Sequence, residues 1–281
     1  MQQSSERWRN DDGLTLYSQS WWPEGGARAL VLIVHGFAEH SSRYDHVART
    51  LVGQGYGVYA LDQRGHGRSE GPRANLHVFD ELVADLRRYS EMLYERHPAL
   101  PRFVFGHSMG GAVTLQLGLE HPHPFAGLVL SAPYLRGPAP LPAPLEPLLD
   151  WLSRRVPDLR TSPLDVGAIS RDPAEVQAYR DDPLVYTGRI KLRMGLELLR
   201  AGPRLLPLAP RVSLPTLILH GSSDRLADVR GSEQLFRQLG STDKTLRVYD
   251  GGYHELFNDV VRDEVFDDLI GWLEPRVAAL S

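Results

Sequence analysis

The stretch "RFVFGHSMGGAVTL", residues 102–115, places one serine between two glycines directly after a short apolar run. The run "RFVF" (102–105) has the composition of a buried strand, and the residues that follow Ser108 are typical of a helix. The segment "GHSMG" (106–110) therefore fits the pattern G-x-S-x-G in the strand–turn–helix setting that this motif requires. The stretch predicts a serine held at the carboxyl end of a strand, where glycines leave room for a tight turn.

A simpler role for Ser108 is to cap the N-terminus of the following helix. Capping would explain the hydroxyl group but not the glycines on both sides of it. We therefore expect Ser108 to be a nucleophile, since the positive end of the helix behind it favours developing negative charge.

The flanking sequence predicts a doubly wound α/β sheet. Compact apolar runs at 30–34, 57–61, 102–105 and 127–131 are typical of buried parallel strands. A helix is expected between the second and third runs, because apolar residues recur there at helical spacing: Phe79, Leu82, Leu86, Tyr89 and Leu93. This alternation of strands and helices favours one mostly parallel sheet with helices on both faces.

Residues 132–210 interrupt the alternation with many prolines and no strand-like run. The α/β order resumes at "PTLILHG" (215–221) and continues to the end of the chain. The sequence therefore predicts an α/β core made of residues 1–131 and 211–281, with a helical cap or lid inserted between them. Insertions of this length are usually functional.

A nucleophilic serine needs a base and an acid that orients the base. In this type of sheet they follow in the order serine, acid, histidine. Asp224 comes directly after one predicted strand and His254 directly after the next. Because both follow the carboxyl ends of their strands, we expect them to meet Ser108 and form a catalytic triad.

Three neighbouring residues are weaker alternatives for the acid and the base. Asp228 has the position of a helix cap, and Asp250 ends a strand only four residues before His254. His220 falls inside the end of a strand. We interpret these residues as structural.

The backbone N–H groups of Phe37 and Met109 are the expected oxyanion hole. Met109 follows the nucleophile, and Phe37 lies in the loop after the first buried strand. His35 is nearby but has no partners at metal-ligand spacing, so we expect no metal and no other cofactor.

Composition limits the other classes of function. The chain has 281 residues, of which 42% are hydrophobic and 23% charged, as in a soluble globular protein with a sizeable core. The formal net charge of −4 offers no basic face for nucleic acid. The absence of cysteine excludes disulfides and thiolate nucleophiles. The polar start lacks the apolar core of a secretory signal, so we expect a cytoplasmic protein.

Longer stretches of the chain resemble one family. They are "HGFAEHSSRYDHVA" (35–48), "YALDQRGHGRSEGPR" (59–73), "GHSMGGA" (106–112), "SAPYL" (131–135), "AISRDPAEVQAYRDDPLVYTGRI" (168–190), "HGSSDRLADVRGS" (220–232) and "DKTLRVYDGGYHELFND" (243–259). These stretches are spread over most of the chain, from residue 35 to residue 259, and resemble the monoacylglycerol lipases of the α/β-hydrolase superfamily, in particular the bacterial members.

The resemblance implies the α/β-hydrolase fold and a serine esterase, peripheral to membranes, that cleaves one fatty acyl chain from glycerol. It implies the same triad and oxyanion donors as the motifs do. It also implies contacts to the glycerol side of the substrate by Glu39, Arg43, His107 and Tyr179. A structural alternative is that Glu39 and Arg43 pair to hold the oxyanion loop. Phe37 stands where family members often have a smaller residue, which would narrow the entrance for the acyl chain.

The predicted insertion would supply an apolar tunnel for the acyl chain. The candidate side chains for this tunnel are Leu141, Leu145, Leu148, Leu149, Trp151 and Leu152. Alternatively, these side chains could insert into a lipid surface beside Arg154 and Arg155. Equally, these side chains could pack the insertion onto the core. Three other activities remain compatible with the motifs: a lysophospholipase, a broad-specificity carboxylesterase and an acyltransferase.

Overall fold

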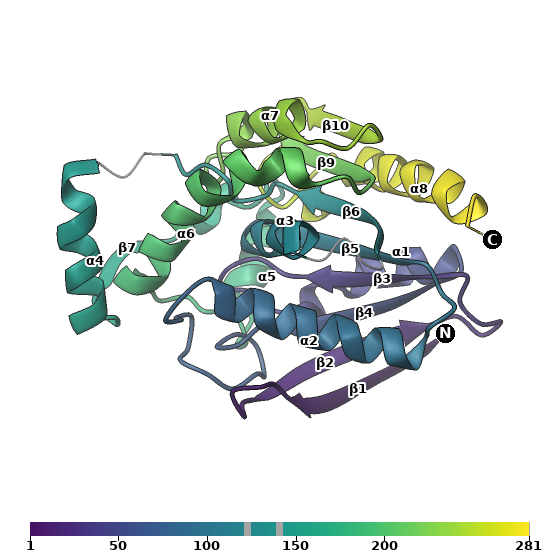
Figure 1. Ribbon diagram of the computed structural model, residues 1–281, viewed down its shortest axis with the longest axis horizontal. Coiled ribbons are helices and arrows are strands. Elements are labelled where there is room, and N and C mark those ends of the chain that lie inside the picture. The colour runs from purple at the N-terminus through teal and green to yellow at the C-terminus, as the bar shows by residue number, and fades with distance from the viewer. Residues whose placement is uncertain (121–124, 139–142, 281) are drawn as a thin grey trace.

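An eight-stranded sheet forms the centre of the protein in a computed structural model that describes residues 1–120, 125–138 and 143–280 (Figure 1). In spatial order its strands are β1 (Gln2–Arg9), β2 (Thr15–Trp22), β4 (Tyr56–Asp62), β3 (Ala29–Val34), β5 (Arg102–His107), β6 (Phe125–Ser131), β9 (Thr216–Gly221) and β10 (Lys244–Tyr249). Only β2 runs antiparallel to both of its neighbours among the strands of this sheet. The mostly parallel sheet is the one that the sequence predicts.

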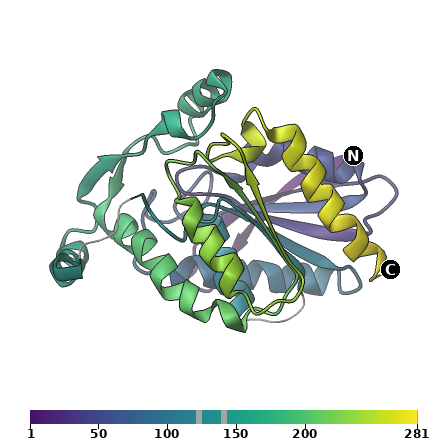
Figure 2. The same cartoon turned by 90° about the horizontal axis from the view of Figure 1, so that it is seen from above.

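Helices cover both faces of the sheet (Figure 2). One apolar cluster packs against α2 (Asp80–Arg96), α3 (Met109–Glu120), α6 (Leu192–Leu205) and α7 (Val229–Gln238). A second cluster, on the other face, packs against α1 (Asp45–Gly53) and α8 (Arg262–Ala278). The predicted apolar stripe of α2 lies in the first cluster, so the helical spacing identified its buried face correctly.

Strands β1 and β2 precede every strand that the sequence analysis identified. They pair over their whole length, from Gln2 opposite Trp22 to Arg9 opposite Thr15. The sequence of β1, "QQSSERWR", has no apolar alternation because it lies at the edge of the sheet and is largely exposed. An edge strand with one exposed flank gives a weak signal in the sequence.

In its described residues, 132–138 and 143–215, the segment between β6 and β9 contributes no strand to the central sheet. It contains α4 (Glu146–Arg155), α5 (Pro173–Asp181) and α6, and the short strands β7 (Arg160–Pro163) and β8 (Arg189–Lys191). The expectation of no strand in this segment was wrong, because β7 and β8 pair antiparallel. Each is too short and too polar to resemble a strand in the sequence. Helix α4 stands at the margin of the molecule, away from the sheet (Figure 1).

The N-terminus of α3 packs against the end of β3 with no space to spare. A Cβ atom on Gly110 would lie 2.2 Å from the carbonyl oxygen of Val34 and 2.5 Å from that of His35. Both atoms belong to the backbone, which cannot rotate away as a side chain would. Glycine at this position therefore sets how closely α3 approaches the sheet.

We expect Gly110→Ala to lower the free energy of unfolding by about 1–3 kcal/mol, the usual cost of overpacking. Urea unfolding followed by circular dichroism measures this change. Gly271→Ala is the matched control. Gly271 lies inside α8, and apart from the neighbouring backbone of that helix a Cβ there would have no described atom within 4 Å. This substitution should raise the free energy of unfolding by roughly 0.5–1 kcal/mol. Equal midpoints for Gly110→Ala and the unsubstituted protein would contradict the packing argument.

Candidate active site

Ser108 occupies a strained turn between β5 and α3. Its φ angle is +52°, in the region that non-glycine residues rarely adopt. Its N–H donates to the carbonyl of Ser131 at 2.9 Å, and its own carbonyl accepts from the N–H of Tyr134 at 2.9 Å. A Cβ on Gly106 would lie 2.3 Å from the carbonyl oxygen of Gly110. The glycines of the motif are thus required by close backbone contacts, as the sequence indicated.

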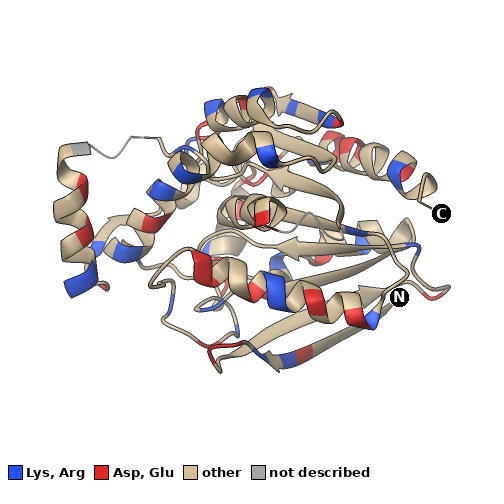
Figure 3. Ribbon diagram, viewed as in Figure 1, with Lys and Arg blue, Asp and Glu red and all other residues tan. Residues whose placement is uncertain are grey.

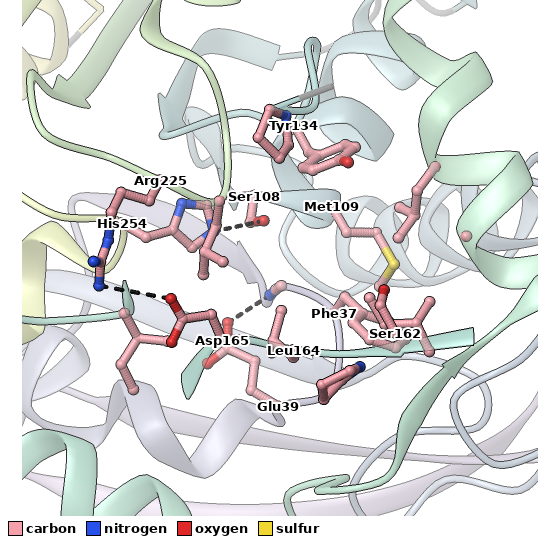
Figure 4. Close-up of a pocket in the computed structure, with 18 of the residues that line it drawn as sticks. Phe37, Glu39, Ser108, Met109, Tyr134, Ser162, Leu164, Asp165, Arg225 and His254 are labelled. Carbon is pink, nitrogen blue, oxygen red and sulfur yellow. Dashed lines mark hydrogen bonds and ion pairs between the residues drawn. The ribbon is translucent and has the colours of Figure 1, made fainter. Parts of the chain in front are cut away.

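The side chains of Ser108, His254 and Asp224 form a continuous hydrogen-bonded chain. Figure 4 shows its first link, from Ser108 to His254. His254 Nε2 lies 2.9 Å from Ser108 Oγ, and His254 Nδ1 lies 2.6 Å from Asp224 Oδ2. A carboxylate can only accept, so Nδ1 carries the proton and Nε2 accepts the hydroxyl proton of Ser108. The loops after β9 and β10 supply the acid and the histidine, in the order that the sequence predicted.

Asp224 is fixed by a set of donors behind the histidine. Its Oδ1 accepts from the N–H groups of Leu226 and Ala227 at 2.8 and 2.9 Å. His220 Nε2 lies 3.2 Å from Asp224 Oδ2, and its Nδ1 accepts from the hydroxyl of Ser232. The sequence analysis assigned His220 a structural place in the strand, and the structure shows that it also supports the buried carboxylate.

The competing acids lie elsewhere. Asp228 accepts from the N–H of Arg230 and caps α7, as its position in the sequence suggested. Asp250 accepts from the hydroxyl of Ser222 at 3.3 Å. Neither is hydrogen-bonded to His254 among the bonds of the described residues.

The charges of this chain of residues shift two pKa values in opposite directions. Burial by itself would lower the pKa of His254, but the charge of Asp224 and its hydrogen bond outweigh burial and raise that pKa above its ordinary value of 6.5. Burial by itself would raise the pKa of Asp224, but His254 and His220 hold it far below its usual range. Burial and the neighbouring His254 lower the pKa of His107 to about 4, so His107 is neutral near pH 7.

The predicted oxyanion donors lie beside Ser108. Met109 is the first residue of α3, and Phe37 lies in the loop after β3 (Figure 4). Within the described part of the chain, neither backbone N–H donates to a protein acceptor. The preceding Gly36 N–H donates to Glu39 Oε1 at 2.6 Å, which orients this loop. Two backbone donors are therefore left for a ligand oxygen.

The residues that the family resemblance places on the glycerol side do cluster. Glu39, His107 and Tyr179 line one cavity together with Ser108 and His254.

Arg43 lies behind this wall instead of lining the cavity, bound to Glu39 Oε2 at 2.8 Å and stacked on the Tyr179 ring. Glu39 and Arg43 therefore pair beside the oxyanion loop, as the structural alternative to a glycerol-binding role expected. Glu255 also belongs to the site, although no motif predicted it: it binds Arg43 and lines the cavity directly after His254. Its only signal was its place beside the histidine.

The cavity has a volume of about 440 Å³, within the range of roughly 300–1,000 Å³ usual for small-molecule sites. Most of its wall is apolar, and much of it comes from the segment between β6 and β9: Tyr134, Pro138, Pro163, Leu164, Ile169, Ile190, Leu198 and Leu199.

Five of the six side chains proposed for a tunnel lie within the described residues, and none of these five lines the cavity. Leu145, Leu148 and Trp151 are exposed on and beside α4, and Leu149 and Leu152 are half-buried. Leu141 lies outside the described residues. The tunnel interpretation fails for these residues because α4 lies at the margin of the molecule, joined to α6 by ion pairs such as that of Asp150 with Arg200, so its apolar side chains do not reach the site.

Because the charge on Asp224 raises the pKa of His254, the rate of ester hydrolysis should depend on pH. The base must be neutral to accept the proton of Ser108, so activity should fall as the pH drops through a value above 6.5. Asp224→Asn removes the charge that raises the pKa of His254, so this acid limb should move to lower pH. The rate constant should also fall by about 10⁴-fold, because the tautomer is no longer held.

The pH profile of 4-nitrophenyl butyrate hydrolysis measures both effects. Asp250→Asn serves as the control, since it removes a nearby carboxylate that is not bonded to His254. An acid limb that stays in place in Asp224→Asn would refute the electrostatic assignment.

Known proteins are similar to this chain over nearly its whole length. A family model described as serine aminopeptidase, S33, matches residues 25–260. A monoacylglycerol lipase of Mycolicibacterium smegmatis is 38% identical over 261 residues, covering 93% of each chain. A monoglyceride lipase of Homo sapiens is 37% identical over 272 residues, covering 96% of this chain and 90% of that one.

Solved structures agree with these similarities. The crystal structure of a Paleococcus ferrophilus monoacylglycerol lipase matches with a TM-score of 0.79 at 32% identity, covering 98% of this chain and 100% of that one. This match confirms the expected α/β-hydrolase fold. The chain belongs to the monoacylglycerol lipase family of that superfamily.

Proposed function

We propose that this protein hydrolyses the ester bond of monoacylglycerols and releases glycerol and a fatty acid. The observation that carries the proposal is the position of the Ser108–His254–Asp224 chain at one apolar cavity with a polar side. The apolar wall suits one acyl chain, and Glu39, Glu255 and Tyr179 on the polar side suit a small hydroxylated head group. The names of the relatives favour this substrate over the alternative activities.

In the first half of the reaction, Ser108 Oγ attacks the ester carbonyl while its proton passes to His254 Nε2. The carbonyl oxygen becomes an oxyanion that the N–H groups of Phe37 and Met109 stabilise. Asp224 stabilises the imidazolium that forms. The intermediate then collapses: the ester C–O bond breaks, His254 returns the proton to the leaving glycerol oxygen, and the acyl group stays on Ser108.

In the second half, water replaces glycerol as the partner of His254. His254 Nε2 takes a proton from this water as its oxygen attacks the acyl carbonyl. The second tetrahedral intermediate uses the same two N–H donors. Its collapse breaks the bond to Ser108 Oγ, which takes the proton back from His254, and the fatty acid leaves.

We also propose that residues 132–210 act as a cap on a core of residues 1–131 and 211–281. The segment supplies much of the apolar wall of the cavity, while the core supplies Ser108, Asp224 and His254. The ion pair between Arg225, next to Asp224 in the chain, and Asp165 of the segment joins the two parts at 3.6 Å (Figure 4). Such a division separates chemistry in the core from recognition of the acyl chain in the cap.

Replacement of the nucleophile tests the activity directly. Ser108→Ala should reduce oleate release from 1-monooleoylglycerol by about 10⁴–10⁶-fold, because only binding and the oxyanion hole remain. The unsubstituted protein should release little oleate from trioleoylglycerol or lysophosphatidylcholine. Equal release from either lipid would refute the substrate assignment, and activity that survives in Ser108→Ala would refute the mechanism.

We further propose a peripheral contact with lipid through α4. None of the described helices combines the length and the hydropathy needed to cross a bilayer. Helix α4 nevertheless exposes Leu148 and Trp151 by 59% and 57%. Arg154 and Arg155 follow in its last turn, and Figure 3 shows basic residues at one end of this helix. Apolar side chains beside arginines are suited to an interface with anionic lipid.

The double substitution Leu148→Ser with Trp151→Ser should weaken cosedimentation with phosphatidylglycerol vesicles by about tenfold, because it removes most of the exposed apolar area of α4. Hydrolysis of soluble 4-nitrophenyl butyrate should stay unchanged, as α4 does not line the cavity. Val260→Ser is the matched control, since Val260 is 62% exposed elsewhere on the surface. Equal losses in both variants would argue against a specific role for α4.

A further inference from the structure

Arg43 is a buried cation that is held from three sides. Glu255 binds it with both carboxylate oxygens, Oε1 to Nη1 and Oε2 to Nη2, each at 2.7 Å. Glu39 Oε2 accepts a third hydrogen bond from Nη1 at 2.8 Å. The ring of Tyr179 lies 4.6 Å from the guanidinium carbon. Only 8% of the Arg43 side chain is exposed. These partners, and not solvent, therefore compensate its positive charge.

The partners of Arg43 line the catalytic cavity, but Arg43 does not. Glu39, Tyr179 and Glu255 all contribute to the wall of the cavity that holds Ser108. Arg43 instead lines a separate polar cavity on its other side, together with residues such as His46 and Glu175. The head-group side of the catalytic cavity therefore presents two carboxylates, while the guanidinium bound between them lies outside the cavity. Arg225 and Asp165 also line the cavity, but their charges compensate each other in an ion pair of 3.6 Å.

This arrangement leaves a net negative wall. Burial by itself would raise the pKa of Glu255, but Arg43 outweighs burial and lowers that pKa to about 2, so Glu255 is ionised at neutral pH. Two carboxylates and one guanidinium sum to one negative charge. Glu39 Oε1 already accepts from the Gly36 N–H and the Tyr44 hydroxyl, and Glu255 Oε2 accepts from Arg43 and Asn258. Glu39 Oε2 and Glu255 Oε1 accept only from Arg43 among the described residues, so each keeps a lone pair, and a carboxylate can only accept hydrogen bonds. Such a wall accepts hydroxyl groups and repels anions.

The Tyr179 hydroxyl adds a neutral donor to the same wall. It is buried, and it has no hydrogen-bond partner among the described residues. Burial raises the pKa of Tyr179, so this hydroxyl stays protonated. A polyol can use both kinds of partner, whereas a phosphate group meets one donor and two like charges.

We propose that Glu255, together with Glu39, selects neutral polyol esters and rejects esters whose head group carries a phosphate, because the two carboxylates hold Arg43 out of the cavity. The inference rests on the proposed hydrolysis of monoacylglycerols and adds a determinant of head-group specificity to it. Glu255 acts on the charge of the wall and on the position of Arg43, not on the reacting atoms.

The experiment compares two substrates with the same acyl chain and the same ester bond: 1-oleoylglycerol and 1-oleoylglycerol 3-phosphate. The readout is the ratio of their kcat/KM values, measured as oleate release. A loss of His254 efficiency affects both substrates and cancels in this ratio. The unsubstituted protein should favour the neutral ester. Glu255→Gln should shift the ratio toward the phosphate ester by about tenfold or more, since it removes one charge and one partner of Arg43.

Three variants separate the causes. Glu255→Asp keeps the charge and should keep most of the selectivity. Glu255→Gln combined with Arg43→Gln should lose the gain on the phosphate ester, because the released guanidinium is gone. Glu175→Gln removes a carboxylate from the cavity on the other side of Arg43 and should leave the ratio unchanged. If Glu255→Gln does not fold, Glu39→Gln replaces it, with the same direction expected.

The outcomes distinguish the two proposals. If the unsubstituted protein does not hydrolyse 1-oleoylglycerol, the proposed function fails. If it hydrolyses both esters equally well, the function stands and the inference is overturned. An unchanged ratio in Glu255→Gln, or in Glu39→Gln where that variant replaces it, would also overturn the inference. A gain that persists without Arg43 would show that the wall charge alone decides, against the proposed withdrawal of the cation.

Discussion

The backbone turn at Ser108 is the constraint on which the rest of the site depends. A residue with a φ of +52° must be held by its surroundings, because the conformation is unfavourable by itself. Backbone hydrogen bonds to Ser131 and Tyr134 hold it from one side, and the contact of Gly110 with the end of β3 holds it from the other. The sheet thus stores strain at one residue and directs its hydroxyl toward His254.

Two buried carboxylates near His254 control its protonation. Asp224 lies on one side of the imidazole and Glu255 follows it in the chain, and both carboxylates favour the imidazolium. Each buried carboxylate is itself compensated, Asp224 by two backbone N–H groups and His220, and Glu255 by Arg43 and Asn258. Buried ions without such partners would destabilise the fold. The same contacts therefore compensate these buried charges and set the charge that a substrate meets.

The segment between β6 and β9 completes the site with apolar surface. Its helix α6 packs into the core on one face of the sheet, through residues such as Met194 and Leu198. Helix α4 lacks such packing and exposes its apolar side chains. One continuous segment thus combines a wall fixed by the core with a free apolar surface. The physical difference is burial, since nine residues of α6 are buried, whereas Ser153 is the only buried residue among those described in α4.

Local sequence determined the parts of this protein whose chemistry is local. Apolar runs identified the parallel strands, the glycines around Ser108 identified the turn, and positions after β9 and β10 identified Asp224 and His254 as neighbours. The strands and the turn were predictable because apolar patterning and turn sterics act over a few residues. His254 and Ser108 are 146 positions apart, but their meeting was predictable because the carboxyl ends of parallel strands lie at one edge of the sheet. Tertiary structure alone decided the pairing of β7 with β8, the exposure of α4 and the binding of Arg43 by Glu255, which lies 212 positions away. Such contacts depend on which surfaces meet after folding, and no spacing in a single chain encodes that meeting.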